Sequence, residues 1–253
     1  MIKPETLNNQ LRINPSMNEE KRLQSLGFRS IAGIDEAGRG PLAGPVVAGA
    51  AILPLEMEYK WLKLIRDSKQ LNPTNRSIAL NELQKFACVA TGQSSPEEID
   101  THGIVKAVNL AMERALNNLG RNADYLLLDA FKLPGSKLPQ KPIIRGDASC
   151  ISIAAASIAA KVERDLLMDN FHEQFPKYGF NSNKGYGTKS HMNAIDNVGP
   201  CSIHRFSFKP VRKKAEELNI FLNRTMMRAI ECKPVDHELK SDFQIKLSGF
   251  SKA

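Results

Sequence analysis

The sequence predicts an α/β protein, in which short buried strands alternate with helices. Short apolar runs bounded by glycine or proline recur along the chain, as at residues 29–35 and 45–53, and such runs are typical of buried strands. Between the runs lie longer segments with helical periodicity, such as residues 103–119, whose apolar side chains fall on one face. Strands interleaved with helices define the α/β class.

Helix caps and breakers divide the first half of the chain. Gly27 ends the first helix, and Asn72-Pro73 supplies an N-cap and a first-turn proline. Ser95 and Glu98 form a capping box, which opens a short helix. The expected elements are a helix at 18–27, strands at 29–35 and 45–53, a helix from 73 to about 86, a strand at 88–93, the short helix after Ser95 and a helix at 103–119.

In the second half, two strands precede a long helix of small residues. The run at 151–160 is small and apolar nearly all round, which suits close burial against a sheet. A polar, glycine-rich loop follows at 181–188. The expected elements are strands at 124–129 and 142–145, a helix at about 150–171, a helix from about 189 that ends before Gly199, a helix at about 213–230 and a polar tail.

Length and composition predict one large domain, or one domain with extensions. The 253 residues are 42% hydrophobic, which is enough for a core, and we expect a leader at 1–17, a domain at 18–212 and a C-terminal extension at 213–253. A net charge of +8 and a pI of about 9.3 favour a polyanionic partner. No apolar stretch approaches the roughly 20 residues that span a bilayer, and the polar N-terminus lacks the core of a secretion signal. Four scattered cysteines without a C-x-x-C pair disfavour a zinc site and predict a reducing cytoplasm.

Two adjacent acids, Asp35 and Glu36, close the first buried strand, and Gly38-Arg39-Gly40 follows them. Adjacent strand residues point to opposite faces unless the strand ends or bulges. Ionised acids at the edge of a core need a positive partner, and Arg39 and a divalent metal are both candidates. A tight turn with solvated acids is an alternative. A dinucleotide-binding loop is disfavoured, because the glycine order differs from G-x-G-x-x-G and the acids would repel a pyrophosphate.

Asp129 and Asp147 share this context, since each closes a short apolar strand. Sites in α/β sheets gather beyond the carboxyl ends of strands, so we expect the four acids to converge. Oxygen ligands without Cys or His indicate Mg²⁺ or Mn²⁺, and a pair of such ions is suited to attack of water on a phosphodiester. The alternative is that Asp129 and Asp147 are turn residues or helix caps, Asp147 in particular.

In these residues the chain resembles the ribonuclease HII family, the type 2 ribonucleases H of prokaryotes, over about residues 18–212. The resemblance implies a ribonuclease H-like fold, a mixed five-stranded sheet flanked by helices with a helical C-terminal region. The motifs that carry it stand in the family's order and are 33–46 (GIDEAGRGPLAGPV), 67–69 (DSK), the strand ending in Asp129, 145–147 (RGD), 152–165 (SIAAASIAAKVERD), 184–188 (KGYGT) and 204–211 (HRFSFKPV).

The resemblance implies a metal-dependent endoribonuclease that hydrolyses the RNA strand of RNA–DNA hybrids. It also implies incision on the 5′ side of a single ribonucleotide embedded in duplex DNA, which leaves 3′-hydroxyl and 5′-phosphate ends. The family's catalytic metal ligands correspond to Asp35, Glu36, Asp129 and Asp147. We expect two ions, with Asp35 bridging them, and a monomeric protein, because nothing in the sequence indicates an obligate oligomer.

The family's substrate-binding residues correspond to Gly38, Arg39, Gly40 and Tyr186. The resemblance implies that the first three contact the ribose 2′-hydroxyl and neighbouring phosphates, and that Tyr186 senses the junction. Backbone groups between glycines can approach a 2′-hydroxyl, the group that separates RNA from DNA. Two positions depart from the family: Ala130 stands where glycine is expected, and Gly187 where many relatives have proline.

Further basic and polar residues are candidates for phosphate contacts, and for each a plain surface charge is the alternative. They are Ser68, Lys69, Lys184 and Arg205, with Lys189 and His204 in the same class. Lys161 stands in the helix of small residues and is a candidate to neutralise the acidic site, with a side chain that only extends to solvent as the alternative. In the tail, Gln244, Leu247 and Phe250 are spaced as in peptides that dock on sliding clamps. Chance and a disordered polar tail are the alternatives there.

Particular residues disfavour two rival functions. A non-catalytic hybrid-binding protein on the same fold is disfavoured, because all four acids are present. The sister enzyme ribonuclease HIII carries an extra N-terminal domain and lacks arginine in the glycine loop. Here 34 residues precede Asp35 and Arg39 is present, so the sequence disfavours that family.

Overall fold

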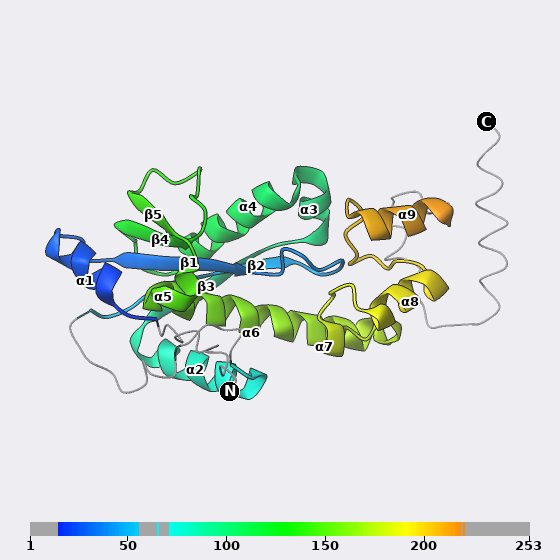
Figure 1. The fold of residues 1–253 in the computed structure, drawn as a ribbon, viewed down its shortest axis with the longest axis horizontal. Helices are drawn as coiled ribbons and strands as arrows, with labels where there is room; N and C mark the ends of the chain where they lie inside the picture. The colour runs from blue at the N-terminus through cyan, green and yellow to red at the C-terminus, as the bar shows by residue number, and fades with distance from the viewer. Residues whose placement is uncertain (1–14, 56–64, 66–70, 219, 221–253) are drawn as a thin grey trace, which may run out of the picture.

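A five-stranded sheet forms the centre of the protein (Figure 1), and its strand order is β3-β2-β1-β4-β5. The computed structural model describes residues 15–55, 65, 71–218 and 220. The strands are β1 (Ile31–Ala37), β2 (Val46–Ile52), β3 (Cys88–Ser94), β4 (Tyr125–Asp129) and β5 (Gln140–Ile143). The mixed five-stranded sheet is confirmed, because β1 pairs antiparallel with β2 and parallel with β4.

The parallel half of the sheet gathers three strand ends at one edge. The strands β1, β4 and β5 run in the same direction, so their carboxyl ends meet there. Ile34 of β1 pairs with Leu128 of β4, which places Asp35 and Asp129 one residue beyond that pair on neighbouring strands. The register therefore brings two acids together at the edge where β1, β4 and β5 end.

Two helices cover the two faces of the sheet (Figure 1): α4 (Ile104–Asn117) lies on one face and α6 (Ile151–Gln174) on the other. The α6 face is packed unusually closely, because glycines of the sheet lie against the helix backbone. A Cβ atom on Gly33 would stand 2.1 Å from the carbonyl carbon of Ser152, and one on Gly49 would stand 2.1 Å from the oxygen of Ala156. The close burial predicted for 151–160 is confirmed.

Shorter helices surround this centre, and several begin where the sequence predicts. Asn72 accepts a hydrogen bond from the Asn75 N–H at 2.8 Å, and the capping box of Ser95 and Glu98 is present. The remaining helices are α1 (Asn18–Ser25), α2 (Pro73–Phe86), α3 (Pro96–His102), α5 (Gly146–Ser149), a 3₁₀ turn η2 (Pro176–Tyr178), α7 (Phe180–Asn183), α8 (Lys189–Val198) and α9 (Lys209–Glu217). None of the helices in the described ranges has both the length and the apolar character that crossing a membrane requires.

The predicted helix over 213–230 is wrong at its start. The helix α9 begins at Lys209 and ends at Glu217, and residues 221–230 lie outside the described part of the chain. Pro210 stands in its first turn, where the missing N–H needs no partner, so proline there marks a helix start. The predicted strand at 142–145 also lies earlier, at Gln140–Ile143.

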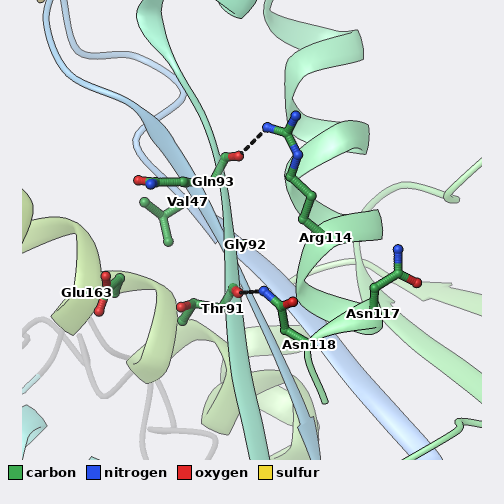
Figure 2. A pocket seen from close by; sticks show the side chains of 8 residues that line it. All are labelled: Val47, Thr91, Gly92, Gln93, Arg114, Asn117, Asn118 and Glu163. Atoms are coloured by element: carbon green, nitrogen blue, oxygen red, sulfur yellow. Dashed lines mark hydrogen bonds between the residues drawn. The ribbon is translucent and has the colours of Figure 1, made fainter. Parts of the chain in front are cut away.

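Two side chains, Arg114 of α4 and Asn118 directly after it, contact the edge strand β3 (Figure 2). Arg114 donates to the carbonyl of Gln93 at 2.6 Å, and Asn118 donates to the carbonyl of Thr91 at 2.9 Å. Arg114 is itself held by the carboxylate of Glu98 at 2.7 Å. Two carbonyls of the edge strand β3 therefore already accept hydrogen bonds from side chains.

Candidate active site

Three carboxylates meet at the edge where the parallel strands end. Asp35 lies in β1, Asp129 is the last residue of β4, and Asp147 lies in α5, shortly after β5. Each offers a ligand oxygen, and these oxygens lie within 4.8 Å of one another. Asp147 is not an N-cap: it lies inside the first turn of α5, and the N-cap of α6 is Cys150.

Backbone and hydroxyl donors orient two of these carboxylates. The Glu36 N–H donates to Asp35 Oδ1 at 2.8 Å, and the Ser157 hydroxyl of α6 also donates to Asp35. The Gly146 N–H donates to Asp129 Oδ1 at 2.8 Å. These donors fix the direction in which the remaining carboxylate lone pairs point.

The triad concentrates negative charge in a buried place. Burial raises the pKa of Asp35 well above its usual value, and the charges of Glu36 and Asp129 raise it further, against the hydrogen bonds from Ser157 and the Glu36 N–H. A divalent cation relieves such repulsion, and three carboxylates without Cys or His form an oxygen-only donor set. The residues present therefore fit Mg²⁺ or Mn²⁺.

Glu36, the fourth acid, is not part of this close group. The strand β1 stays regular through Ala37, so successive side chains alternate between the faces of the sheet. Asp35 faces α6, and Glu36 points to the opposite side, where its Oε1 accepts from Arg39 Nη1 at 3.3 Å. The convergence of all four acids at one spot is thus seen for three of them.

The backbone conformation of Ala130, which follows Asp129, explains why glycine is expected at this position. Ala130 has a φ of 59°, in the left-handed region that glycine adopts without steric cost. Its N–H donates to the carbonyl of Ile143 at 3.0 Å, so the turn is anchored to β5. A left-handed alanine costs about 1–2 kcal/mol, and the turn keeps Asp129 in place despite that cost.

Two buried arginines, Arg164 and Arg205, lie beneath the glycine loop (residues 38–45) and donate hydrogen bonds to its backbone carbonyls. Arg205 donates to the carbonyls of Gly38 at 2.6 Å and Arg39 at 2.9 Å, and Arg164 donates to the carbonyl of Pro45 at 3.1 Å. Gly38 has a φ of +94°, and a Cβ there would stand 2.1 Å from Arg164 Nε, so only glycine fits. The loop carbonyls are thereby fixed toward the protein interior.

The phosphate contact predicted for Arg205 does not agree with its position. The side chain is 0% exposed, and its bonds go to loop carbonyls, including Gly44 at 2.9 Å. His204, in the same class of candidates, is also fully buried. Burial, and then the neighbouring Arg164, lower the pKa of Arg205 to about 9, which leaves it cationic at neutral pH. Arg205 is thus a positioning residue beneath the loop.

Tyr186 stands beside the glycine loop although it is distant in sequence. Its side chain is exposed, and its Cε1 lies 4.0 Å from where a Cβ on Gly40 would be. The guanidinium carbon of Arg164 lies 5.9 Å from the centre of the Tyr186 ring. The Leu42 N–H donates to the carbonyl of Gly185 at 2.8 Å, which joins the two loops directly.

The other lysine candidates differ in their surroundings. Lys184 pairs with the carboxylate of Asp169, and its Nζ lies 3.3 Å from the carbonyl of Asp165. Lys161 pairs with Asp165 at 2.8 Å, whereas Lys189 is exposed at the start of α8. The remaining predicted residues, Ser68, Lys69, Gln244, Leu247 and Phe250, lie outside the described residues.

Sequence reasoning did not assign roles to Ser157, Arg164 or His191, which support these loops and carboxylates. A signal for the first two was present: Ser157 and Arg164 are seven residues apart on one face of a helix whose first half is small and apolar. A polar residue and a charge on a buried face require partners. Those partners are Asp35 and the glycine loop.

Comparison with known proteins finds relatives over most of the chain. The family model described as Ribonuclease HII matches residues 32–211. Ribonuclease HII of Desulfitobacterium hafniense is 48% identical over 206 residues, which cover 81% of this chain and 78% of the relative. Ribonuclease HII of Dehalococcoides mccartyi is 47% identical over 201 residues, which cover 79% of this chain and 95% of the relative.

Solved structures share the fold. Ribonuclease H2 from Pyrococcus horikoshii superposes with a TM-score of 0.65 at 24% identity, covering 76% of this chain and 99% of that one. The enzyme in a PCNA:RNase HII complex from Archaeoglobus fulgidus gives 0.59 at 24% identity, covering 76% and 100%. Bst-RNase HIII in complex with Mn²⁺ gives 0.57 at 18% identity, covering 78% and 73%.

Proposed function

Because the chain belongs to the ribonuclease HII family, it is a ribonuclease H that acts on RNA–DNA hybrids, and we propose two finer properties for it. It incises duplex DNA on the 5′ side of a single embedded ribonucleotide, which leaves 3′-hydroxyl and 5′-phosphate ends. It carries out this hydrolysis with two divalent ions, Mg²⁺ or Mn²⁺.

One observation supports both properties. The acidic triad (Asp35, Asp129 and Asp147) lies beside two loops that we call the recognition loops: the glycine loop and the loop that carries Tyr186. Asp35 and the glycine loop belong to one continuous segment, and Tyr186 lies against Gly40. A duplex that brings a ribose to the loop therefore brings its phosphate toward the carboxylates. Attack on the phosphate and recognition of the sugar then involve adjacent residues.

We propose that Asp35, Asp129 and Asp147 would hold the divalent ions, and that Glu36 would join them as the fourth ligand by leaving its ion pair with Arg39. Bound divalent ions supply Lewis-acid stabilisation of the charge that develops at the attacked phosphate. The protein contributes orientation: Ser157 and the Glu36 N–H fix the Asp35 carboxylate, and the Gly146 N–H fixes Asp129.

We propose that the loop of Gly38, Arg39 and Gly40 reads the ribose 2′-hydroxyl. Its carbonyls at Gly38 and Arg39 are engaged by Arg205, and Gly40 carries no side chain to keep a sugar away. Tyr186 presents an exposed ring and hydroxyl at the same place and is suited to contact the sugar at the junction. The 2′-hydroxyl is the group that separates RNA from DNA.

The wider proposals follow from packing and charge. Val211 and Ala215 of α9 are buried in one cluster with Phe180 and Ile195, so we place the end of the catalytic domain after Glu217 rather than at residue 212. A net charge of +8 suits a duplex partner, to which Lys184, Ser68 and Lys69 are proposed phosphate contacts. We also propose that the protein is a cytoplasmic monomer and that Gln244, Leu247 and Phe250 in the tail contact a sliding clamp.

The experiment is cleavage of a labelled RNA–DNA hybrid by protein first stripped of metal with a chelator. We expect no cleavage in chelator, restored cutting of the RNA strand with Mg²⁺ or Mn²⁺, and no cutting of a DNA–DNA duplex of the same sequence. Cut products should ligate only as 5′-phosphate and 3′-hydroxyl ends. Tight hybrid binding without cleavage in either metal would instead indicate a non-catalytic hybrid-binding protein.

A further inference from the structure

Two buried histidines connect the Tyr186 loop to the segment beneath the glycine loop. His191 of α8 and His204 are both 0% exposed, and their Nε2 atoms lie 3.0 Å apart. At the other end of the first ring, His191 Nδ1 lies 2.9 Å from the carbonyl oxygen of Tyr186. On the far side of the His204 ring, the Cys201 N–H donates to His204 Nδ1 at 3.0 Å.

The partners at the two ends determine where the protons lie. A backbone N–H can only donate, so His204 Nδ1 is the acceptor and the neutral ring carries its proton on Nε2. That proton is donated to His191 Nε2, which is therefore unprotonated. The proton of His191 is on Nδ1 and is donated to the Tyr186 carbonyl, which can only accept. One tautomer of each ring satisfies the whole chain of bonds.

The surroundings favour this neutral pair. Tyr178 and Phe180 pack around both rings, with ring centres 4.9 Å apart for Tyr178 and His204 and 5.3 Å apart for Phe180 and His191. Burial lowers the pKa of His191 against the opposing effect of its bond to Tyr186. The rings therefore act as hydrogen-bonding connectors within an aromatic cluster.

The histidine pair lies where the glycine loop, the Tyr186 loop and the segment at 204–205 are joined by backbone hydrogen bonds. His204 forms an isolated bridge with Ala43, which lies in the glycine loop, and the Arg205 N–H donates to the Leu42 carbonyl at 2.8 Å. The Leu42 N–H in turn donates to Gly185 at 2.8 Å. The histidine pair adds a second tie, at the Tyr186 carbonyl itself, so the backbone of Tyr186 is held on both sides.

We propose that the His191–His204 pair positions Tyr186 against Gly40, so that the enzyme's preference for a single ribonucleotide depends on the bond from His191 Nδ1 to the Tyr186 carbonyl. This inference rests on the proposed role of Tyr186 at the ribonucleotide. His191 is a positioning residue in this account, since its ring is fully buried and does not reach the substrate.

Two variants of His191 separate its two bonds. Asparagine places its amide nitrogen near the Nδ1 position, so His191→Asn keeps the donor to Tyr186 and loses the bond to His204. Glutamine reaches the Nε2 position, so His191→Gln keeps an acceptor for His204 and loses the donor to Tyr186. His191→Asn leaves the Nε2–H of His204 without its acceptor, whereas in His191→Gln the Tyr186 carbonyl keeps the hydrogen bond from the Thr188 N–H at 2.8 Å. A lower ratio in His191→Gln therefore cannot be explained by a larger number of buried groups without partners.

The quantity to measure is the ratio of kcat/KM for a duplex with one ribonucleotide to kcat/KM for a long hybrid. We expect His191→Asn to stay within about twofold of the wild-type ratio and His191→Gln to lower it about tenfold, the effect of one hydrogen bond of roughly 1.4 kcal/mol. A merely structural role would lower both activities together and leave the ratio unchanged in both variants. Equal ratios in the two variants would overturn the inference.

The Tyr186→Ala variant distinguishes failure of the positioning inference for His191 from failure of the proposed role of Tyr186. If Tyr186→Ala lowers the ratio and His191→Gln does not, only the positioning inference is overturned. If Tyr186→Ala leaves the ratio unchanged, the role of Tyr186 and the inference fail together. Should the glutamine variant not fold, the imidazole nitrogen NMR spectrum of the wild-type protein decides: we expect Nδ1–H on His191 and Nε2–H on His204, and the reverse tautomers would contradict the inference.

Discussion

Replacing Asp35 by asparagine is expected to lower hybrid cleavage by about a thousandfold or more while hybrid binding survives. The substitution keeps the size of the side chain and removes the charge from the centre of the acidic triad, where the ligand oxygens lie within 4.8 Å of one another. Duplex binding depends on the basic surface and the two loops, which the substitution does not touch. Single-turnover cleavage and a gel-shift assay in chelator measure the two properties separately.

The same variant is expected to unfold at a higher temperature than the wild type when metal is absent. A carboxyl whose folded-state pKa is raised destabilises the protein once it ionises, so stability falls as pH rises from the unfolded value of 3.8 through the raised value. Asp35→Asn removes this penalty, and we expect a melting temperature a few degrees higher at neutral pH in chelator.

A conservative change elsewhere controls for the loss of an acid in general. Asp196, exposed in α8, is suited to this because Asp196→Asn removes one charge from the surface and leaves the triad intact. Near-normal cleavage by Asp35→Asn, or an equal loss in Asp196→Asn, would contradict the assignment of Asp35 to the metal centre.

Adding one methyl group at Gly33 is expected to lower the free energy of unfolding by about 3 kcal/mol or more. The new Cβ would stand 2.1 Å from the carbonyl carbon of Ser152 and 2.4 Å from the N of Ile153, and both are backbone atoms of α6 that no rotamer change can move. The sheet and α6 would have to separate, which would also displace Ser157 from Asp35. Urea denaturation followed by circular dichroism measures the change.

Gly120→Ala is the matched control, since it adds the same methyl group where no atom lies within 4 Å. Its backbone has a φ of +65°, so we expect only the cost of a left-handed alanine, about 1–2 kcal/mol. If Gly33→Ala were no more destabilising than Gly120→Ala, the close packing of β1 on α6 would not be a requirement of the fold.

The acids show which part of the site can be predicted from the chain alone. Asp35, Asp129 and Asp147 each follow a short apolar run, and the carboxyl ends of parallel strands share one edge of a sheet, so their meeting could be expected. The position of Glu36 depends on whether β1 ends or continues at Asp35. The strand continues to Ala37, and alternation sends Glu36 to the other face.

The supporting residues could not be predicted in the same way, because their roles depend on contacts distant in sequence. Arg205 and His204 stand in a basic-aromatic segment that reads as exposed, yet both are 0% exposed. Their partners are the loop carbonyl of Gly38 and the ring of His191, which come from other segments of the chain. A buried charge is rare enough that composition favours the surface.

The central claim is that the acidic triad and the two recognition loops form one site that cuts at a ribonucleotide in DNA. The measurement that tests it most directly uses an end-labelled DNA duplex with one ribonucleotide, incubated with Mg²⁺, with Mn²⁺ and with chelator. We predict a single cut on the 5′ side of the ribonucleotide that requires metal. An intact duplex in both metals, under conditions in which a long hybrid is cut, would contradict the assignment of Gly38, Arg39, Gly40 and Tyr186 to the junction.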